Sequence, residues 1–158
     1  MRIGGPGRKG LAAPMPRTND KKSRVLAIDP GAKRIGLAVS DELGLTAQGL
    51  ETFETGTGVD FLDHLQELID RYEIRAVIIG LPLSMRGTDI EGSGRSRALA
   101  ARIADRFALE VVLMDERMTS LEAERVLKSG DRSYERGDID KLAAVLLLQS
   151  HLDERRGA

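Results

Sequence analysis

Three carboxylates lie where a protein fold could use them for chemistry. Asp29 ends the apolar run Val25–Ile28, and Glu116 closely follows a second apolar run. Asp140 lies at the start of the last apolar helix that the sequence predicts. Clustered carboxylates repel one another unless a cation lies among them, and such oxygen ligands suit Mg²⁺ or Mn²⁺. Metal ions held in this way stabilise the attacking and leaving oxygens of a phosphodiester during hydrolysis. Asp29, Glu116 and Asp140 are therefore candidate catalytic residues and metal ligands.

Each of these acids also has a purely structural interpretation. Asp29 could cap the Pro-Gly turn that follows it. Asp115 and Glu116 could simply end a strand, with the neighbouring Arg117 as an ion-pair partner. Asp140 could act only on the helix dipole, an effect worth about 0.3–1 kcal/mol. No single position decides between the two interpretations.

Basic side chains accompany these acids in the sequence. Lys33 and Arg34 follow the first acid, Arg117 follows the second, and Arg86 lies in a loop that contains glycine. Cationic side chains of this kind position a phosphodiester and compensate its charge. We therefore expect these four residues to contact nucleic acid. Aromatic residues make up only 3% of the chain, which disfavours base stacking and favours recognition of backbone and shape.

The elements that must position these residues alternate between strand and helix. Apolar, β-branched runs predict strands over 25–29, 35–40, 46–53, 76–79 and 111–114. Helical spacing predicts helices over 61–72, 95–107 and 119–128, and a last helix that starts at Asp138 or Ile139. This order predicts an α/β fold with a mixed five-stranded sheet and helices on both faces. Because carboxyl ends of neighbouring strands converge in such sheets, the acids could share one crevice.

Composition excludes several other kinds of protein. The 158 residues fit one domain, which we expect over residues 24–158. The chain has no cysteine and only two histidines, so disulfides and zinc-cysteine sites are excluded and a histidine-rich metal site is disfavoured. No apolar run is long enough for a membrane helix. We therefore expect a cytoplasmic protein without a membrane partner.

Charge is distributed unevenly although the net charge is only -1. Residues 1–24 contain seven Lys or Arg and one acid, whereas residues 41–73 contain nine acids and one arginine. Residues 1–23 are also rich in Gly and Pro and lack an apolar period, so we expect a disordered basic tail. A bound polyanion should avoid the acidic segment 41–73.

Four segments together resemble the YqgF (RuvX) family. They are Leu26–Asp41, Gly80–Thr88, Asp115–Ser120 and Ile139–Asp153. The likeness covers residues 25–153, and four motifs in the same order make it specific. The resemblance implies an RNase H-like fold, which Holliday-junction resolvases share. The family is described both as Holliday-junction resolvases and as nucleases that mature the 5′ end of pre-16S rRNA.

The resemblance places the family's acidic site on Asp29, Glu116 and Asp140, with Mg²⁺ or Mn²⁺ as the implied cofactor. It implies structured RNA or branched DNA as the partner, and a homodimer where the substrate is two-fold symmetric. This chain departs from the family pattern in the loop after the fourth strand. Ser84 and Arg86 replace residues that are commonly Asn and an acid or amide. The fourth strand also ends without an acid, which leaves a lean set of ligands.

Two other functions remain compatible with the sequence. The strand-Asp-x-Gly pattern at Asp29 also occurs in ATP-handling folds of the actin and sugar-kinase type, although those need two such units. The lean acidic set also allows a non-catalytic nucleic-acid-binding factor that acts in rRNA processing or transcription. A metal-dependent nuclease is the function that the sequence favours.

Overall fold

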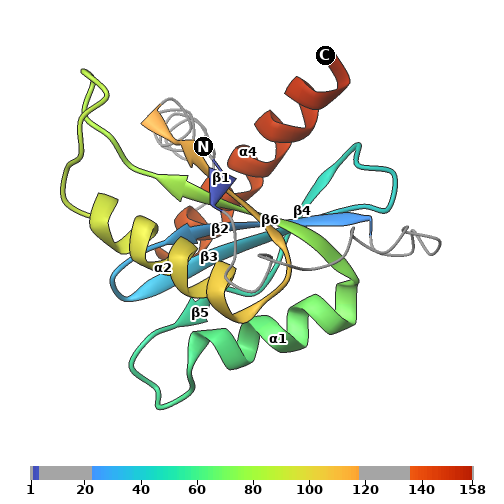
Figure 1. Ribbon diagram of the computed structural model, residues 1–158, viewed down its shortest axis with the longest axis horizontal. Coiled ribbons are helices and arrows are strands. Elements are labelled where there is room, and N and C mark those ends of the chain that lie inside the picture. The colour runs from blue at the N-terminus through green and yellow to red at the C-terminus, as the bar shows by residue number, and fades with distance from the viewer. Residues whose placement is uncertain (1, 4–22, 118–135, 158) are drawn as a thin grey trace, which may run out of the picture.

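A mixed β-sheet forms the centre of the molecule. The computed structural model describes residues 2–3, 23–117 and 136–157 (Figure 1). Strand β2 (Arg24–Pro30) pairs antiparallel with β3 (Arg34–Ser40) and parallel with β6 (Ile74–Leu81). Strand β7 (Glu110–Asp115) lies parallel to β6 on the other side. These four strands are the ones that carry or adjoin the candidate acids.

Three short strands extend this sheet at its edges. Strand β1 (Arg2–Ile3) pairs antiparallel with β7, and both β4 (Ala47–Gly49) and β5 (Phe53–Glu54) pair with β3. Within the described residues the sheet therefore has seven strands, in the order β1-β7-β6-β2-β3-β4 with β5 beside β3, rather than the five expected. The strand expected over 46–53 is divided into β4 and β5, and between them the N–H of Leu50 donates to the Leu37 carbonyl.

The segment expected to be a basic tail, residues 1–23, is described only in part. Residues 2–3 form the edge strand β1, and Ser23 directly precedes β2. Residues 4–22 lie outside the described residues, so the expected disorder stays a prediction there.

Helices cover both faces of the sheet, as expected. Figure 1 shows α1 (Phe61–Tyr72) and α2 (Ser93–Arg106) on one side and α4 (Arg136–Gly157) on the other. Helix α1 begins after Asp60, whose carboxylate accepts a hydrogen bond from the N–H of Leu62. Helix α4 begins at Arg136, two residues before the earlier of the two expected starts, Asp138. The helix expected over 119–128 lies outside the described residues.

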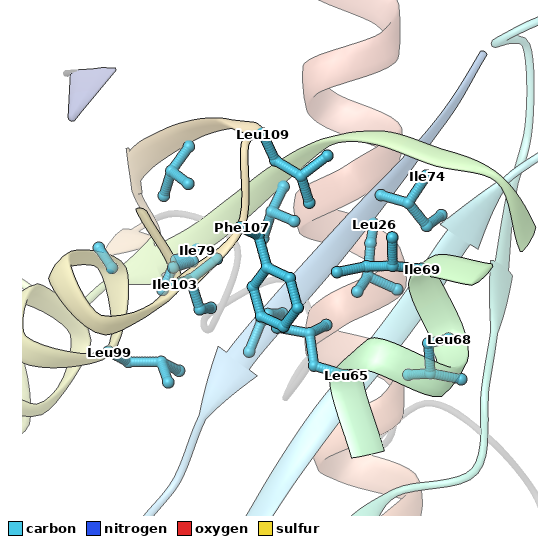
Figure 2. Close-up of a cluster of buried hydrophobic side chains, with 14 of the residues drawn as sticks. Leu26, Leu65, Leu68, Ile69, Ile74, Ile79, Leu99, Ile103, Phe107 and Leu109 are labelled. Atoms are coloured by element: carbon cyan, nitrogen blue, oxygen red, sulfur yellow. The ribbon is translucent and has the colours of Figure 1, made fainter. Parts of the chain in front are cut away.

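Two apolar cores hold these layers together. The larger core lies between the sheet and helices α1 and α2, where Leu26, Leu65 and Ile103 are among the fully buried side chains (Figure 2). The smaller core lies beneath α4 and includes several alanines, among them Ala27, Ala38 and Ala144. Small side chains let α4 approach the sheet closely, and this approach brings Asp140 towards the strand ends. None of the described helices is both long and apolar enough to span a membrane.

Candidate active site

The carboxylate of Asp29 lies at the end of β2 on the sheet face that α4 covers. Side chains alternate between faces along a strand, and Ala27 packs in the core beneath α4. Leu26 and Ile28 instead pack in the core on the α1 and α2 side. Asp29 therefore projects to the α4 side, where it is partly buried.

Two glycines make room for the other acids on this face. Gly80 of β6 lies directly beneath Glu116, and a Cβ atom on Gly80 would collide with its carboxylate. Gly36 of β3 pairs with Asp29 across the strands, and a Cβ atom there would collide with the backbone carbonyl of Asp140. Glu116 thus lies over Gly80, and Asp140 lies over Gly36, the neighbour of Asp29 on the adjacent strand. The sheet brings both glycines, and with them the three acids, to the same end of the strands.

Asp29 and Glu116 form a close pair in this crevice. Their side chains share a hydrogen bond, which requires one proton between the two carboxyl groups. Burial raises the pKa of Glu116 to about 8, and the charges of Asp29 and Asp115 add to the rise. Burial also raises the pKa of Asp29, while the hydrogen bond to Glu116 opposes the rise. Without a cation, the two groups therefore behave as one proton-sharing pair.

Asp140 is the third acid of the crevice and lies less close. Burial raises its pKa first, the charge of Asp29 adds to the rise, and the Arg34 guanidinium lowers it. Among the residues that the structure describes, no group of three or more His, Asp or Glu side chains is spaced to hold a metal ion as it stands. The structure therefore places a tight pair beside a third carboxylate that interacts with it electrostatically.

The chemistry of this donor set fits a hard divalent cation. Three carboxylates supply oxygen ligands, and two of them are close enough to share a proton that a cation could replace. A cation would also remove the repulsion that raises the pKa values of these acids. Asp29, Glu116 and Asp140 are the described residues that could hold Mg²⁺ or Mn²⁺.

Two of the four basic residues lie in the turn beside the acids. The turn from β2 to β3 closes with a hydrogen bond from the N–H of Gly31 to the carbonyl of Arg34, 2.9 Å long. A side chain at Gly31 would collide with that carbonyl, so the turn requires glycine. Lys33 is exposed at the turn, and Arg34 is partly buried near Asp140.

Arg117 is bound to two other parts of the protein. Its Nε atom donates to Oδ2 of Asp115 at 2.7 Å, so Arg117 forms the ion pair that was one of the structural interpretations of this segment. Its guanidinium also donates to the carbonyl oxygens of Ser84 and Met85, at 3.4 and 3.0 Å. Arg117 therefore holds the loop that follows β6 against the end of β7.

That loop forms a rigid rim beside the crevice. The hydroxyls of Ser84 and Thr88 lie 2.6 Å apart, and the N–H of Ser84 donates to the Thr88 carbonyl at 2.8 Å. Gly87 adopts a φ of 82°, which favours glycine at the turn. Arg86 is exposed at the tip of this turn, next to Met85. The structure therefore presents Arg86 to solvent.

The sequence did not single out Gly36 or Gly80, whereas the ion pair of Asp115 with Arg117 was one of the structural interpretations that it allowed. A glycine in a strand run signals a close approach of another group, and both glycines carried that signal. The groups that approach these glycines come from distant segments of the chain, so the sequence pattern could not identify which groups they are.

Comparison with known proteins places the chain in a family. The model of the RuvX family, described as Holliday junction resolvase, matches residues 23–154. A protein of Koribacter versatilis named "Putative pre-16S rRNA nuclease" is 48% identical over 136 residues, which covers 85% of this chain and 88% of that protein. A protein of Geobacillus kaustophilus with the same name is 45% identical over 137 residues, which covers 84% and 99%.

Solved structures share the fold at much lower identity. The Holliday junction resolvase of fowlpox virus matches with a TM-score of 0.52 and 13% identity, over 83% of this chain and 99% of that one. The same resolvase in complex with Holliday junction DNA matches with a TM-score of 0.50 and 12% identity, over 84% and 98%. These matches confirm the expected RNase H-like fold. The sequence relatives and the family match together show that this chain belongs to the RuvX family.

Proposed function

We propose that this chain is a metal-dependent nuclease that hydrolyses phosphodiester bonds at the Asp29–Glu116–Asp140 crevice. The observation that carries the proposal is the convergence of the three acids at one end of the sheet, with Glu116 over Gly80 and the Asp140 backbone over Gly36, which pairs with Asp29. Burying acids that repel one another lowers the stability of the fold. A site that binds a cation and a phosphate gives a reason for this cost. The names of the sequence relatives support the same activity.

The residues around the crevice have separable roles in this proposal. A divalent cation held by the three acids would supply Lewis-acid activation of water and neutralise charge on the phosphodiester oxygens. Lys33 and Arg34 lie beside the crevice, where they can bind the phosphates that flank the bond to be cut. Arg86 extends the cationic surface along the loop rim. Arg117 is a positioning residue, because it fixes this rim and its charge is already paired.

Pre-16S rRNA is the substrate that we favour, with cleavage at its 5′ end during ribosome biogenesis in the cytoplasm. The names of the curated relatives support this choice. A four-way DNA junction is the second candidate, supported by the description of the family model. A two-fold symmetric junction would call for a homodimer, whereas a single RNA strand would not. A non-catalytic RNA-binding factor remains the alternative function.

The decisive experiment compares wild type with three charge-neutralising variants in one cleavage assay. The variants are Asp29→Asn, Glu116→Gln and Asp140→Asn, tested on an rRNA precursor and on a four-way junction with Mg²⁺ or Mn²⁺. We expect each variant to lose at least about 100-fold in rate, because each removes a ligand of the cation. Circular dichroism and thermal unfolding should show that each variant stays folded.

Lys141→Gln provides a matched control for the Asp140 variant. Lys141 is adjacent on α4, and its side-chain carbons pack over Gly49 rather than over the crevice. This variant should cleave like wild type. Cleavage that survives in all three acid variants would rule out the proposed site. Metal-independent RNA binding without cleavage by wild type would establish the non-catalytic alternative.

A further inference from the structure

A pocket of about 300 Å³ lies at the opposite end of the sheet from the acidic crevice. Its walls come from the start of β2, the start of β6, the turn after β3 and the last turns of α4. Arg75, Arg155 and Arg156 line it together with Ser23, Glu42 and Leu152. A volume of this size is at the lower end of the range for small-molecule sites.

The three arginines of the pocket differ in how their charge is compensated. Arg156 pairs with Asp153, and Glu42 is paired by Arg24 at 3.2 Å. Within the described part of the chain, neither Arg75 nor Arg155 forms an ion pair. Uncompensated guanidinium groups that line one pocket raise the local positive potential.

Arg75 is held in place rather than free to move away. Its Nε atom donates to the carbonyl oxygen of Ser23 at 3.2 Å, and the side chain is partly buried. This bond leaves the terminal nitrogens of Arg75 as further donors at the pocket wall. Arg155 lies in the last turn of α4, where arginines counter the partial negative charge of the helix end.

The pKa of His151 responds to the charged groups around this pocket. Burial lowers its pKa first, and the charges of Arg155 and Arg75 lower it further. Glu154 and Glu110 act in the opposite direction but do not reverse the change. Arg155 and Arg75 therefore both lie close enough to His151 to act on its charge.

We propose that this pocket binds a phosphate group through Arg75 and Arg155. Guanidinium groups match the geometry of phosphate oxygens and remain charged at every relevant pH. The phosphate could belong to the backbone of a bound nucleic acid or to a free phosphate or mononucleotide. The backbone source rests on the proposed nuclease function, whereas the free source does not.

The position of the pocket suits a second contact with a long substrate. Asp140 and Arg155 lie fifteen residues apart on the same helix, which corresponds to about 22 Å along its axis. A polynucleotide cut at the crevice could reach this distance within a few nucleotides of backbone. A second contact would fix the direction in which the strand enters the acidic site.

Nuclear magnetic resonance of the two histidines tests the proposal directly. His64 serves as an internal reference, because it lies on α1 with its ring 5.0 Å from the ring of Phe53, in another part of the molecule. Inorganic phosphate added at constant ionic strength should raise the pKa of His151 by about 0.5 unit or more, since a nearby anion favours imidazolium. The ring resonances of His64 should not respond to phosphate.

Two double variants link the response to the arginines. Arg75→Gln with Arg155→Gln should abolish the response of His151. The control pair, Arg71→Gln with Arg102→Gln, removes the same charge from exposed sites on α1 and α2 and should leave the response intact. If His151 still responds to phosphate in the variant that lacks both Arg75 and Arg155, these arginines do not bind the phosphate.

Nucleic acid binding separates the two sources of phosphate. Catalytically inactive Asp29→Asn protein should bind duplex RNA with a salt dependence whose log–log slope falls by about 1 when Arg75 and Arg155 are replaced. A changed slope identifies a backbone phosphate, and an unchanged slope with an intact His151 response to mononucleotide identifies a free ligand. No response of His151 to phosphate, mononucleotide or RNA would overturn the proposal.

The outcome is independent of the cleavage assay. If wild type cleaves normally but His151 does not respond to phosphate, the proposed nuclease function stands and the proposed phosphate pocket fails. If wild type does not cleave but His151 responds to inorganic phosphate, the phosphate pocket stands and the nuclease function fails.

Discussion

At the scale of single residues, Glu116 carries the clearest electrostatic signature. Its carboxyl group is partly buried above Gly80 and beside Asp29. The folded protein raises the pKa of Glu116 from 4.5 to about 8, whereas the unfolded chain keeps the lower value. Between these two values the folded state holds a proton that the unfolded state has released. The metal-free protein must therefore lose stability as the pH rises through this window.

We predict that Glu116→Gln removes this loss. At pH 8 without metal, the variant should be more stable than wild type by on the order of 2 kcal/mol, allowing for screening by solvent. Near pH 4.5 the two proteins should differ little, because wild-type Glu116 is then largely protonated in the folded state. Urea unfolding with a chelator, measured across this pH range, gives both values.

Glu67→Gln is the control for this measurement, since Glu67 is exposed on α1. Its stability should follow the wild-type pH curve. A Glu116→Gln curve that runs parallel to wild type would show that Glu116 does not carry the proton. Mn²⁺ should stabilise wild type at pH 8 far more than Glu116→Gln, because the variant lacks a charged ligand.

At the scale of elements, the approach of α4 to β3 sets the position of Asp140. Gly36 faces the backbone of Asp140, and Ala38 and Ala144 continue the contact as part of the core under the helix. At Gly36 the contact is with the backbone of Asp140 rather than with a side chain. A larger residue at position 36 would therefore cause a clash that no side-chain rotation could relieve.

We predict that Gly36→Ala destabilises the protein by about 2 kcal/mol, because the new methyl group forces α4 away from β3. The matched control is Gly94→Ala in α2, where a Cβ atom meets no atom within 4 Å. That change should stabilise the protein by about 0.5–1 kcal/mol, since alanine is the better helix former. Thermal or urea unfolding of both variants measures the contrast, and equal effects would contradict the close contact at Gly36.

At the scale of the whole molecule, the acids of α1 and the candidate active site lie on opposite faces of the sheet. Helix α1 carries part of the acidic segment 41–73 and covers the face opposite to α4, whereas Glu42 of the same segment lines the arginine pocket. The candidate active site lies on the α4 side, and so does the wall of the arginine pocket that α4 provides. A polyanion that follows α4 therefore keeps the sheet between itself and α1.

We predict that neutralising two exposed acids on α1 has little effect on RNA binding. Glu67→Gln with Asp70→Asn should change the affinity less than about threefold at physiological salt, because the Debye length there is about 8 Å. The slope of affinity against salt should be unchanged, since no phosphate contact is gained. A steeper slope in a filter-binding titration would place RNA against α1 and contradict this orientation.

Much of this molecule could be predicted because its information is local. Alternating strand and helix periods indicated β2, β3, β6, β7 and the three described helices, since each period reflects which face of an element is buried. Strand ends marked Asp29 and Glu116 as residues of interest. Short edge strands were missed or merged, because two or three residues carry no period and depend on the neighbouring strand for their hydrogen bonds.

The sequence by itself determined the layers of the fold and the acids that end its strands. Only the tertiary structure decided that Gly80 lies under Glu116, that Arg117 also holds the loop rim, and that Arg75 shares a pocket with Arg155. Each of these contacts joins segments more than thirty residues apart. Their geometry follows from how closely helices and strands pack, and no local pattern in the chain encodes that distance.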